Sequence, residues 1–220
     1  MFEAKEIFTK NNDWILFIFL FILFLLAIVR LSFKDRLLHT NTLFIQKKYL
    51  KQYFNKEKNI VLNLFQTSLF IIQVLSLSLL FYFAIDNFKL NPIYIGFNGY
   101  LYILLGITLY FLFRHLIGMF LAEVFSLKKF HKRVLYDKMS YFNNLSLWIL
   151  PFIITYAYID IFKGGFFTFI LVLFSILLVF RYVLFILNNK TLLYNNLFYF
   201  ILYLCALEIA PLVILFKLTI

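Results

Sequence analysis

The sequence predicts an all-α integral membrane protein with about six membrane-spanning helices and both ends of the chain outside. Of the 220 residues, 64% are hydrophobic and only 14% are charged, whereas a soluble domain is about 25% charged. Apolar runs near the length of about 20 residues that a bilayer requires recur along the whole chain. The predicted spans lie at 13–30, 60–85, 99–125, 144–162, 165–187 and 192–216 of a single domain, 1–220.

The first span is predicted to stay in the mature protein. Acidic residues precede its apolar run at Glu3, Glu6 and Asp13, and no small-residue cleavage site follows it. A secretory signal peptide would instead begin with a basic segment and end at such a site.

The distribution of cations predicts the orientation of the spans. The first, third and fifth loops hold fourteen of the 21 lysines and arginines, and the other loops and the two chain ends hold five. Because such residues concentrate in cytoplasmic loops, we place the basic loops 31–59 and 126–143 in the cytoplasm. The chain is therefore expected to cross its membrane several times.

The basic loops also offer candidate contacts with anionic lipid or with a partner protein. The segment 41–58 has apolar residues at near-helical spacing among lysines, which favours an amphipathic helix in the cytoplasmic interface. A merely solvated loop is the alternative, and contact with RNA or a ribosome is electrostatically possible but less favoured. The candidate contact residues are Lys47, Lys48, Lys51, Lys128, Lys129, Lys132 and Arg133.

Polar amides mark the second span. Asn63, Gln66 and Gln73 fall on one side of a helix, since separations of three, seven and ten residues return to nearly the same face. In lipid such amides hydrogen-bond to neighbouring helices. We favour a packing role for them over a substrate-lining stripe.

The third span carries Arg114, His115 and Glu123, which form the centre of a candidate polar site. Ionisable groups at membrane depth normally face a protein interior, a cavity or a partner. At 100° per residue Arg114 and Glu123 point in opposite directions, so they are not expected to pair with each other. Glu123 is expected within reach of Arg181, on the fifth span.

Glu208 completes the candidate polar site, in the sixth span and three residues before Pro211. A proline can kink a helix and free a backbone carbonyl. Broken helices beside a carboxylate occur in ion-coupled transporters, but a structural hydrogen bond of Glu208 to a neighbouring helix is an equal alternative.

Motifs of known chemistry are missing from the chain. The sequence has no phosphate-binding glycine loop, no HExxH and no GxSxG, and its only cysteine, Cys205, has no intrachain partner. We therefore expect no catalytic residues, no metal site and no cofactor, and the sequence argues against an enzyme without excluding one.

The order of the spans, the long basic loop after the first of them and the segment FRHLIGMFLAEVF around Arg114 resemble a family of small multi-span inner-membrane proteins of Bacteroidota-type bacteria, a domain of unknown function. The resemblance covers most of the chain. It implies a bacterial inner membrane and no particular activity.

Two functional hypotheses follow. The first is a non-enzymatic membrane subunit that docks onto a larger envelope complex, one for protein export or envelope assembly, through charges directed at an outer helical face. The second is a small transporter or lipid-handling protein in which Arg114, His115, Glu123 and Glu208 line a cavity. A polar cavity that joins these residues would favour the second hypothesis.

Overall fold

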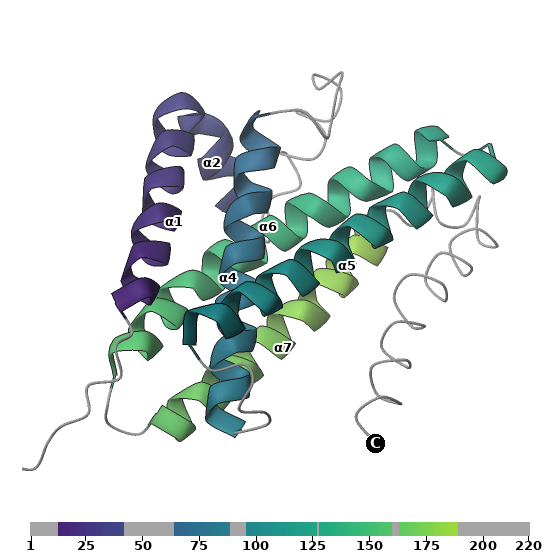
Figure 1. Cartoon of the computed structure of the whole chain (residues 1–220). Coiled ribbons are helices and arrows are strands. Elements are labelled where there is room, and N and C mark those ends of the chain that lie inside the picture. The colour runs from purple at the N-terminus through teal and green to yellow at the C-terminus, as the bar shows by residue number, and fades with distance from the viewer. Residues whose placement is uncertain (1–12, 42–63, 89–95, 127, 160–162, 189–220) are drawn as a thin grey trace, which may run out of the picture.

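The computed structural model describes residues 13–41, 64–88, 96–126, 128–159 and 163–188, and all regular structure in these residues is helical (Figure 1). The prediction of an all-α fold is confirmed for this part of the chain. The described helices are α1 (Asp13–Ser32), α2 (Lys34–Asn41), α4 (Leu64–Phe88), α5 (Gly96–Val124), α6 (Lys128–Tyr158) and α7 (Lys163–Asn188).

Four of these helices, α1, α4, α5 and α7, are long and apolar enough to cross a membrane. They coincide with the first, second, third and fifth predicted spans. The predicted fourth span, 144–162, corresponds to the second half of α6, and the predicted sixth span, 192–216, lies outside the described residues. The total of six spans and their orientation stay predictions.

The segment 126–143 differs from the basic loop that the sequence predicts. It is helical from Lys128 onward, as the first half of α6, and several of its polar side chains are buried, among them Asp137, Ser140 and Asn143. Hydropathy does not reveal such a segment, because its polar groups pack against polar groups of other helices rather than against water. The segment 33–41, from the other predicted basic loop, includes the short helix α2.

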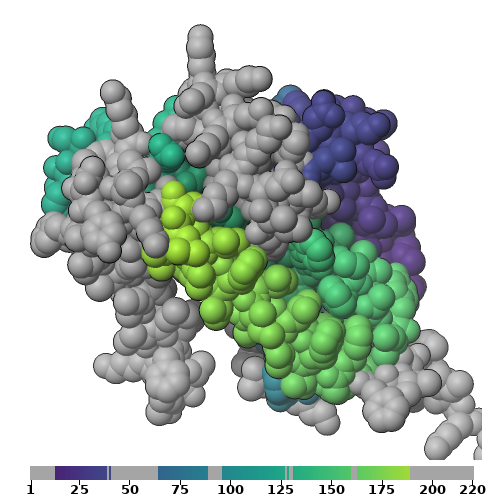
Figure 2. Space-filling model, turned by 180° about the vertical axis from the view of Figure 1, so that it is seen from behind, coloured from purple at the N-terminus to yellow at the C-terminus, as the bar shows by residue number. Residues whose placement is uncertain are grey.

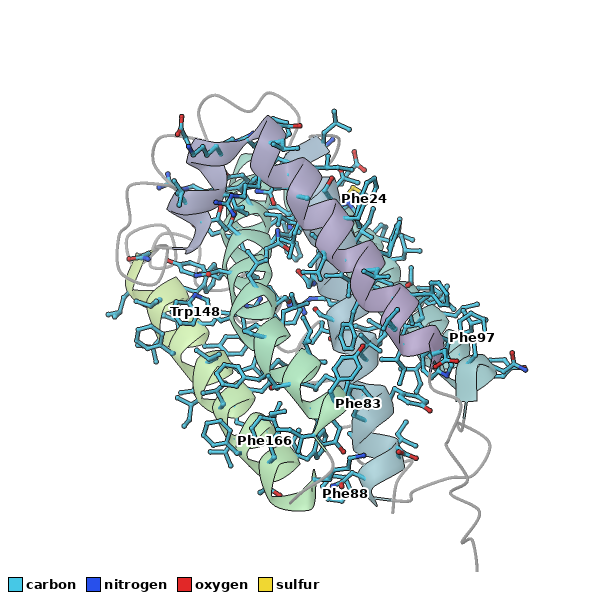
Figure 3. All side chains as sticks on the ribbon, turned by 90° about the vertical axis from the view of Figure 1, so that its left-hand side faces the viewer. Phe24, Phe83, Phe88, Phe97, Trp148 and Phe166 are labelled. Carbon is cyan, nitrogen blue, oxygen red and sulfur yellow. The ribbon has the colours of Figure 1, made fainter. Side chains whose placement is uncertain are left out.

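α4 and α6 form the centre of the described helices. α4 contacts α1, α5, α6 and α7, while α6 contacts α2, α4, α5 and α7. Figure 2 shows α7 lying along α6 on the face opposite to the view of Figure 1. Buried Phe83 of α4 lies between helices, whereas Phe24 of α1 is exposed (Figure 3). Polar groups inside and large apolar groups outside suit a lipid environment.

Two groups of ring contacts mark the two ends of the described helices. At one end, here called the aromatic end, the Trp14 ring lies 5.1 Å from Tyr82 and 5.3 Å from Tyr100, and the Tyr156 ring lies 5.2 Å from Phe167. These residues stand at the start of α1, the end of α4, the start of α5, the end of α6 and the start of α7. Consecutive long helices therefore run in alternating directions.

The other end, here called the basic end, joins the end of α1 to α2 and the start of α4. The Phe33 ring lies 5.6 Å from that of Phe65, and the Arg36 guanidinium lies 4.9 Å from the Phe65 ring centre. By the alternation of the helices, the end of α5, the start of α6 and the end of α7 lie toward this end as well. The positions of Trp14, Tyr82 and Tyr100 agree with the alternation expected for successive spans.

Candidate functional site

A cavity of about 240 Å³ opens among α4, α5, α6 and α7, in the half of the molecule toward the basic end. Its wall combines cations, amides and rings, and no acidic residue lines it within the described part of the chain. The lining residues are Gln66, Thr67, Phe70, Gln73, Phe111, Leu112, Arg114, His115, His131, Leu135, Lys138, Met139, Phe142 and Arg181.

Arg181 of α7 contributes a buried guanidinium to the cavity, with only 5% of the residue exposed. Its Nη2 donates a hydrogen bond to the carbonyl oxygen of Lys138 at 3.3 Å, and its guanidinium carbon lies 4.3 Å from the centre of the Phe142 ring. Stacking on an aromatic face suits the planar guanidinium. These contacts join α7 to α6 and fix the position of the charge.

Lys138 and His131 of α6 lie deep in the same wall. Lys138 is 6% exposed, and its Nζ lies 5.2 Å from the centre of the Phe185 ring of α7. Burial, together with the nearby charges of His115 and Lys138, lowers the pKa of His131 to about 4. His131 is therefore neutral at pH 7, and a neutral imidazole has one nitrogen that donates a hydrogen bond and one that accepts.

The amides of α4 form the polar part of the floor. Asn143 donates a hydrogen bond to Gln66 Oε1 at 3.0 Å, and Gln66 Nε2 donates to Ser140 Oγ at 3.5 Å, so Gln66 joins α4 to α6. Gln73, 2% exposed, presents an Oε1 that has no hydrogen-bond partner among the described residues. A buried acceptor without a partner costs free energy, so it calls for a donor from a ligand or a water molecule.

α5 supplies the outer wall. Arg114 and His115 are half-buried, whereas Leu112 is 53% exposed although it lines the cavity. The cavity therefore extends from buried cations on α6 and α7 to half-buried and exposed side chains on α5.

A protein-family comparison matches residues 15–219 to a domain of unknown function, DUF4271. The chain belongs to the DUF4271 family. The matched region contains every residue that lines the cavity, so the site is part of the DUF4271 domain itself. Neither the comparison with curated proteins nor that with solved structures gave a match.

The DUF4271 fold brings together three of the five residues of the predicted polar site, namely Arg114, His115 and Arg181. Glu123 does not line the cavity. It accepts a hydrogen bond from Lys128 Nζ at 2.7 Å, in an exposed ion pair at the turn between α5 and α6. Glu208 lies outside the described residues.

The predicted lipid or partner contacts lie apart from the cavity where the structure describes them. Lys128, Lys132 and Arg133 are exposed on the first turns of α6. The segment 42–58, with Lys47, Lys48 and Lys51, lies outside the described residues, as does the Lys129 side chain. Gln66 and Gln73 both line the cavity, and Gln66 also joins α4 to α6.

Several site residues were missed by the sequence analysis, chiefly His131, Lys138 and Phe142. A signal for them exists: His131, Leu135, Lys138 and Phe142 follow one another at intervals of four, three and four residues, which places them on one face of a helix. The assignment of 126–143 to a loop concealed that face.

The chemistry of the wall suits recognition of an anion. Arginine presents donors in a fixed fork that matches the oxygens of phosphate or carboxylate, and lysine adds a point charge. Among the described residues, no group of three or more His, Cys, Asp or Glu side chains stands close enough together to hold a metal ion.

Proposed function

We propose that this DUF4271 protein is an integral protein of the bacterial inner membrane that binds an anionic, phosphate-type group in the cavity, in the handling or transport of a lipid or a related anion. The observation that carries the proposal is the lining of the cavity, in which Arg114, Lys138 and Arg181 converge from three helices with no acidic residue among the described lining. Four long apolar helices support the membrane location.

Two of the cations that line the cavity are buried. Lys138 and Arg181 are both more than nine-tenths buried, and they face a space instead of filling it. An anion placed in that space would interact with several cations at once, in surroundings where water screens little.

The geometry favours this function over a subunit of an envelope complex. The subunit hypothesis expects the intramembrane charges at an outer helical face. Arg114, His115 and Arg181 instead share one cavity. Glu123 is exposed, and its carboxylate forms an ion pair with Lys128 of the same chain.

Anion binding can be tested with the purified full-length protein in a neutral detergent. Inorganic phosphate and dioctanoyl phosphatidylglycerol are titrated separately while the unfolding temperature is followed, because a ligand that binds only the folded state raises it. We expect at least one of these anions to stabilise the protein. Arg114→Gln should weaken that binding about tenfold, since a charge-assisted hydrogen bond contributes about 1.5–3 kcal/mol.

Arg30→Gln is the matched control. It removes the same charge from an exposed position at the end of α1, outside the cavity. Equal effects of both variants, or no stabilisation by either anion, would reject the proposed function. Intact binding together with loss of a stably co-purifying partner protein in Arg114→Gln would instead support the subunit hypothesis.

A further inference from the structure

The exposed edge of the cavity lies between α4 and α5. Thr67 of α4 and Leu112 of α5 both line the cavity and are both exposed, while Gln66 and Gln73 of α4 are buried within it. The opening on this side is therefore a slot between two adjacent helices, which are in contact with each other.

The surface beside the slot is apolar. Leu112 is 53% exposed, and Leu116, one turn further along α5, is 55% exposed. Leu109 and Phe113 of the same helix are exposed as well. α5 is one of the four helices suited to cross a membrane, and only 6% of its most apolar window is buried. This surface of α5 is suited to contact lipid chains, so in a membrane the slot would open toward the bilayer interior.

A line of aromatic rings leads from the slot to the buried cations. The Phe70 ring of α4 lies 5.6 Å from the Phe111 ring of α5, and the Phe111 ring lies 5.9 Å from that of Phe142 of α6. The Phe142 ring in turn carries the Arg181 guanidinium at 4.3 Å. One continuous path thus changes from apolar at the surface to cationic at the floor.

From this path we infer that the ligand is an amphiphile, a lipid that bears a phosphate group and enters sideways from the bilayer through the slot between α4 and α5. The inference rests on the proposed function and names its ligand class. The phosphate group lies against Arg181, Lys138 and Arg114, and the apolar chain leaves past Phe111 and Leu112. A free phosphate ion would gain nothing from the apolar wall, whereas a lipid chain matches it.

The source of the phosphate is tested by comparing three probes on the full-length protein in neutral detergent. Dioctanoyl phosphatidylglycerol carries the chains and the phosphate, glycerol 3-phosphate carries the phosphate alone, and dioctanoylglycerol carries the chains without a phosphate group. We expect the first probe to bind at least tenfold more tightly than either of the others.

The route is tested by narrowing the slot. Leu112→Trp and, from the opposite wall, Thr67→Trp should each weaken binding of phosphatidylglycerol at least fivefold. Leu116→Trp, an equally exposed position of α5 outside the cavity, should leave it unchanged. Because all three side chains are exposed, the substitutions spare the buried core, and the unfolding temperature without ligand reports on folding.

The outcomes distinguish a failure of the lateral route from a failure of the anion-binding function. Equal affinity for glycerol 3-phosphate and phosphatidylglycerol, or full lipid binding in both slot variants, would overturn the lateral route and leave the anion-binding function standing. Equal affinity for dioctanoylglycerol and phosphatidylglycerol, or no binding of any of the three, would reject the anion-binding function and the inference together.

Discussion

The guanidinium carbon of Arg181 lies 4.3 Å from the centre of the Phe142 ring. The same guanidinium donates a hydrogen bond to the carbonyl of Lys138, one turn before Phe142 on α6. Two consecutive turns of α6 thus hold one cation of α7 in place at the cavity wall. A cation fixed in this way needs little reorganisation to meet an anion, which favours binding.

Arg181→Lys is therefore expected to lower both stability and anion binding although it keeps the charge. An ammonium group lacks the planar face that stacks on Phe142 and the fork that holds two oxygens. The loss of a desolvated cation–π contact should cost about 2 kcal/mol of unfolding free energy. Reversible unfolding in mixed detergent micelles measures it.

Arg30→Lys provides the control for that exchange at an exposed position of α1. It should change neither the unfolding free energy nor the titration midpoint. An Arg181→Lys protein with the stability and affinity of the wild type would contradict the role assigned to the stacked guanidinium.

The hydrogen bond from Asn143 to Gln66 is expected to couple α6 to α4. Gln66→Leu and Asn143→Leu should each destabilise the protein, because each leaves a buried amide without its partner. The double variant should lose less than the sum of the two, by about 1 kcal/mol, the scale of hydrogen bonds between membrane helices. A double-mutant cycle of unfolding free energies measures this coupling, and strictly additive losses would show that the two amides act separately.

The lowered pKa of His131 leads us to expect that the free energy of unfolding falls in mild acid. Its pKa of about 4 in the folded protein lies below the usual 6.5, so between these values the unfolded chain binds a proton that the folded chain does not. Stability should therefore fall as the pH falls through this window, by at most about 3 kcal/mol. His115 and Lys138 are the nearby cations that oppose protonation.

His131→Gln should flatten that dependence when unfolding temperatures are compared between pH 7.5 and 4.5. His115 is present in both proteins, so a difference between the two curves reports on the residue at position 131. Parallel curves for the two proteins would contradict the burial of a neutral His131. Phosphatidylglycerol should also reduce the acid loss of the wild type, since a bound anion favours the protonated imidazole.

The predicted orientation has the basic end in the cytoplasm and the aromatic end on the other side of the membrane. In a Cys205→Ala background, Lys163→Cys at the start of α7 should react with a membrane-impermeant maleimide added to spheroplasts. Lys132→Cys on the first turns of α6 should react only after the membrane is broken. The reverse pattern of labelling would invert the predicted topology.

The sequence was sufficient to predict the elements whose signal is apolar length. α1, α4, α5 and α7 coincide with predicted spans, because about 20 apolar residues in a row have few alternatives to a membrane helix. Arg114, His115 and Arg181, which line the cavity, were also singled out from the sequence, since a charge within an apolar run is energetically costly.

The cavity residues of α6 were missed because their burial depends on how the helices pack and cannot be read from the neighbouring sequence. Lys138 reads as one of many cations of a cytoplasmic loop until α6 is seen packed between α4 and α7, where Lys138 is 6% exposed. The contact of Glu123 was also not foreseen. Its helix ends one residue later, so its carboxylate reaches Lys128 across the turn.

The most direct measurement of the central claim is the distance between a lipid phosphorus and the arginine side chains of the cavity. Solid-state NMR can measure phosphorus-31 to nitrogen-15 dipolar couplings on arginine-labelled protein in vesicles that contain phosphatidylglycerol. A guanidinium that hydrogen-bonds a phosphate places the two nuclei about 4 Å apart. We predict such a coupling in the wild type and in Arg30→Gln, and its marked reduction in Arg114→Gln and in Arg181→Gln. A coupling of equal strength in all four proteins would arise from surface arginines alone and would contradict an anion-binding cavity.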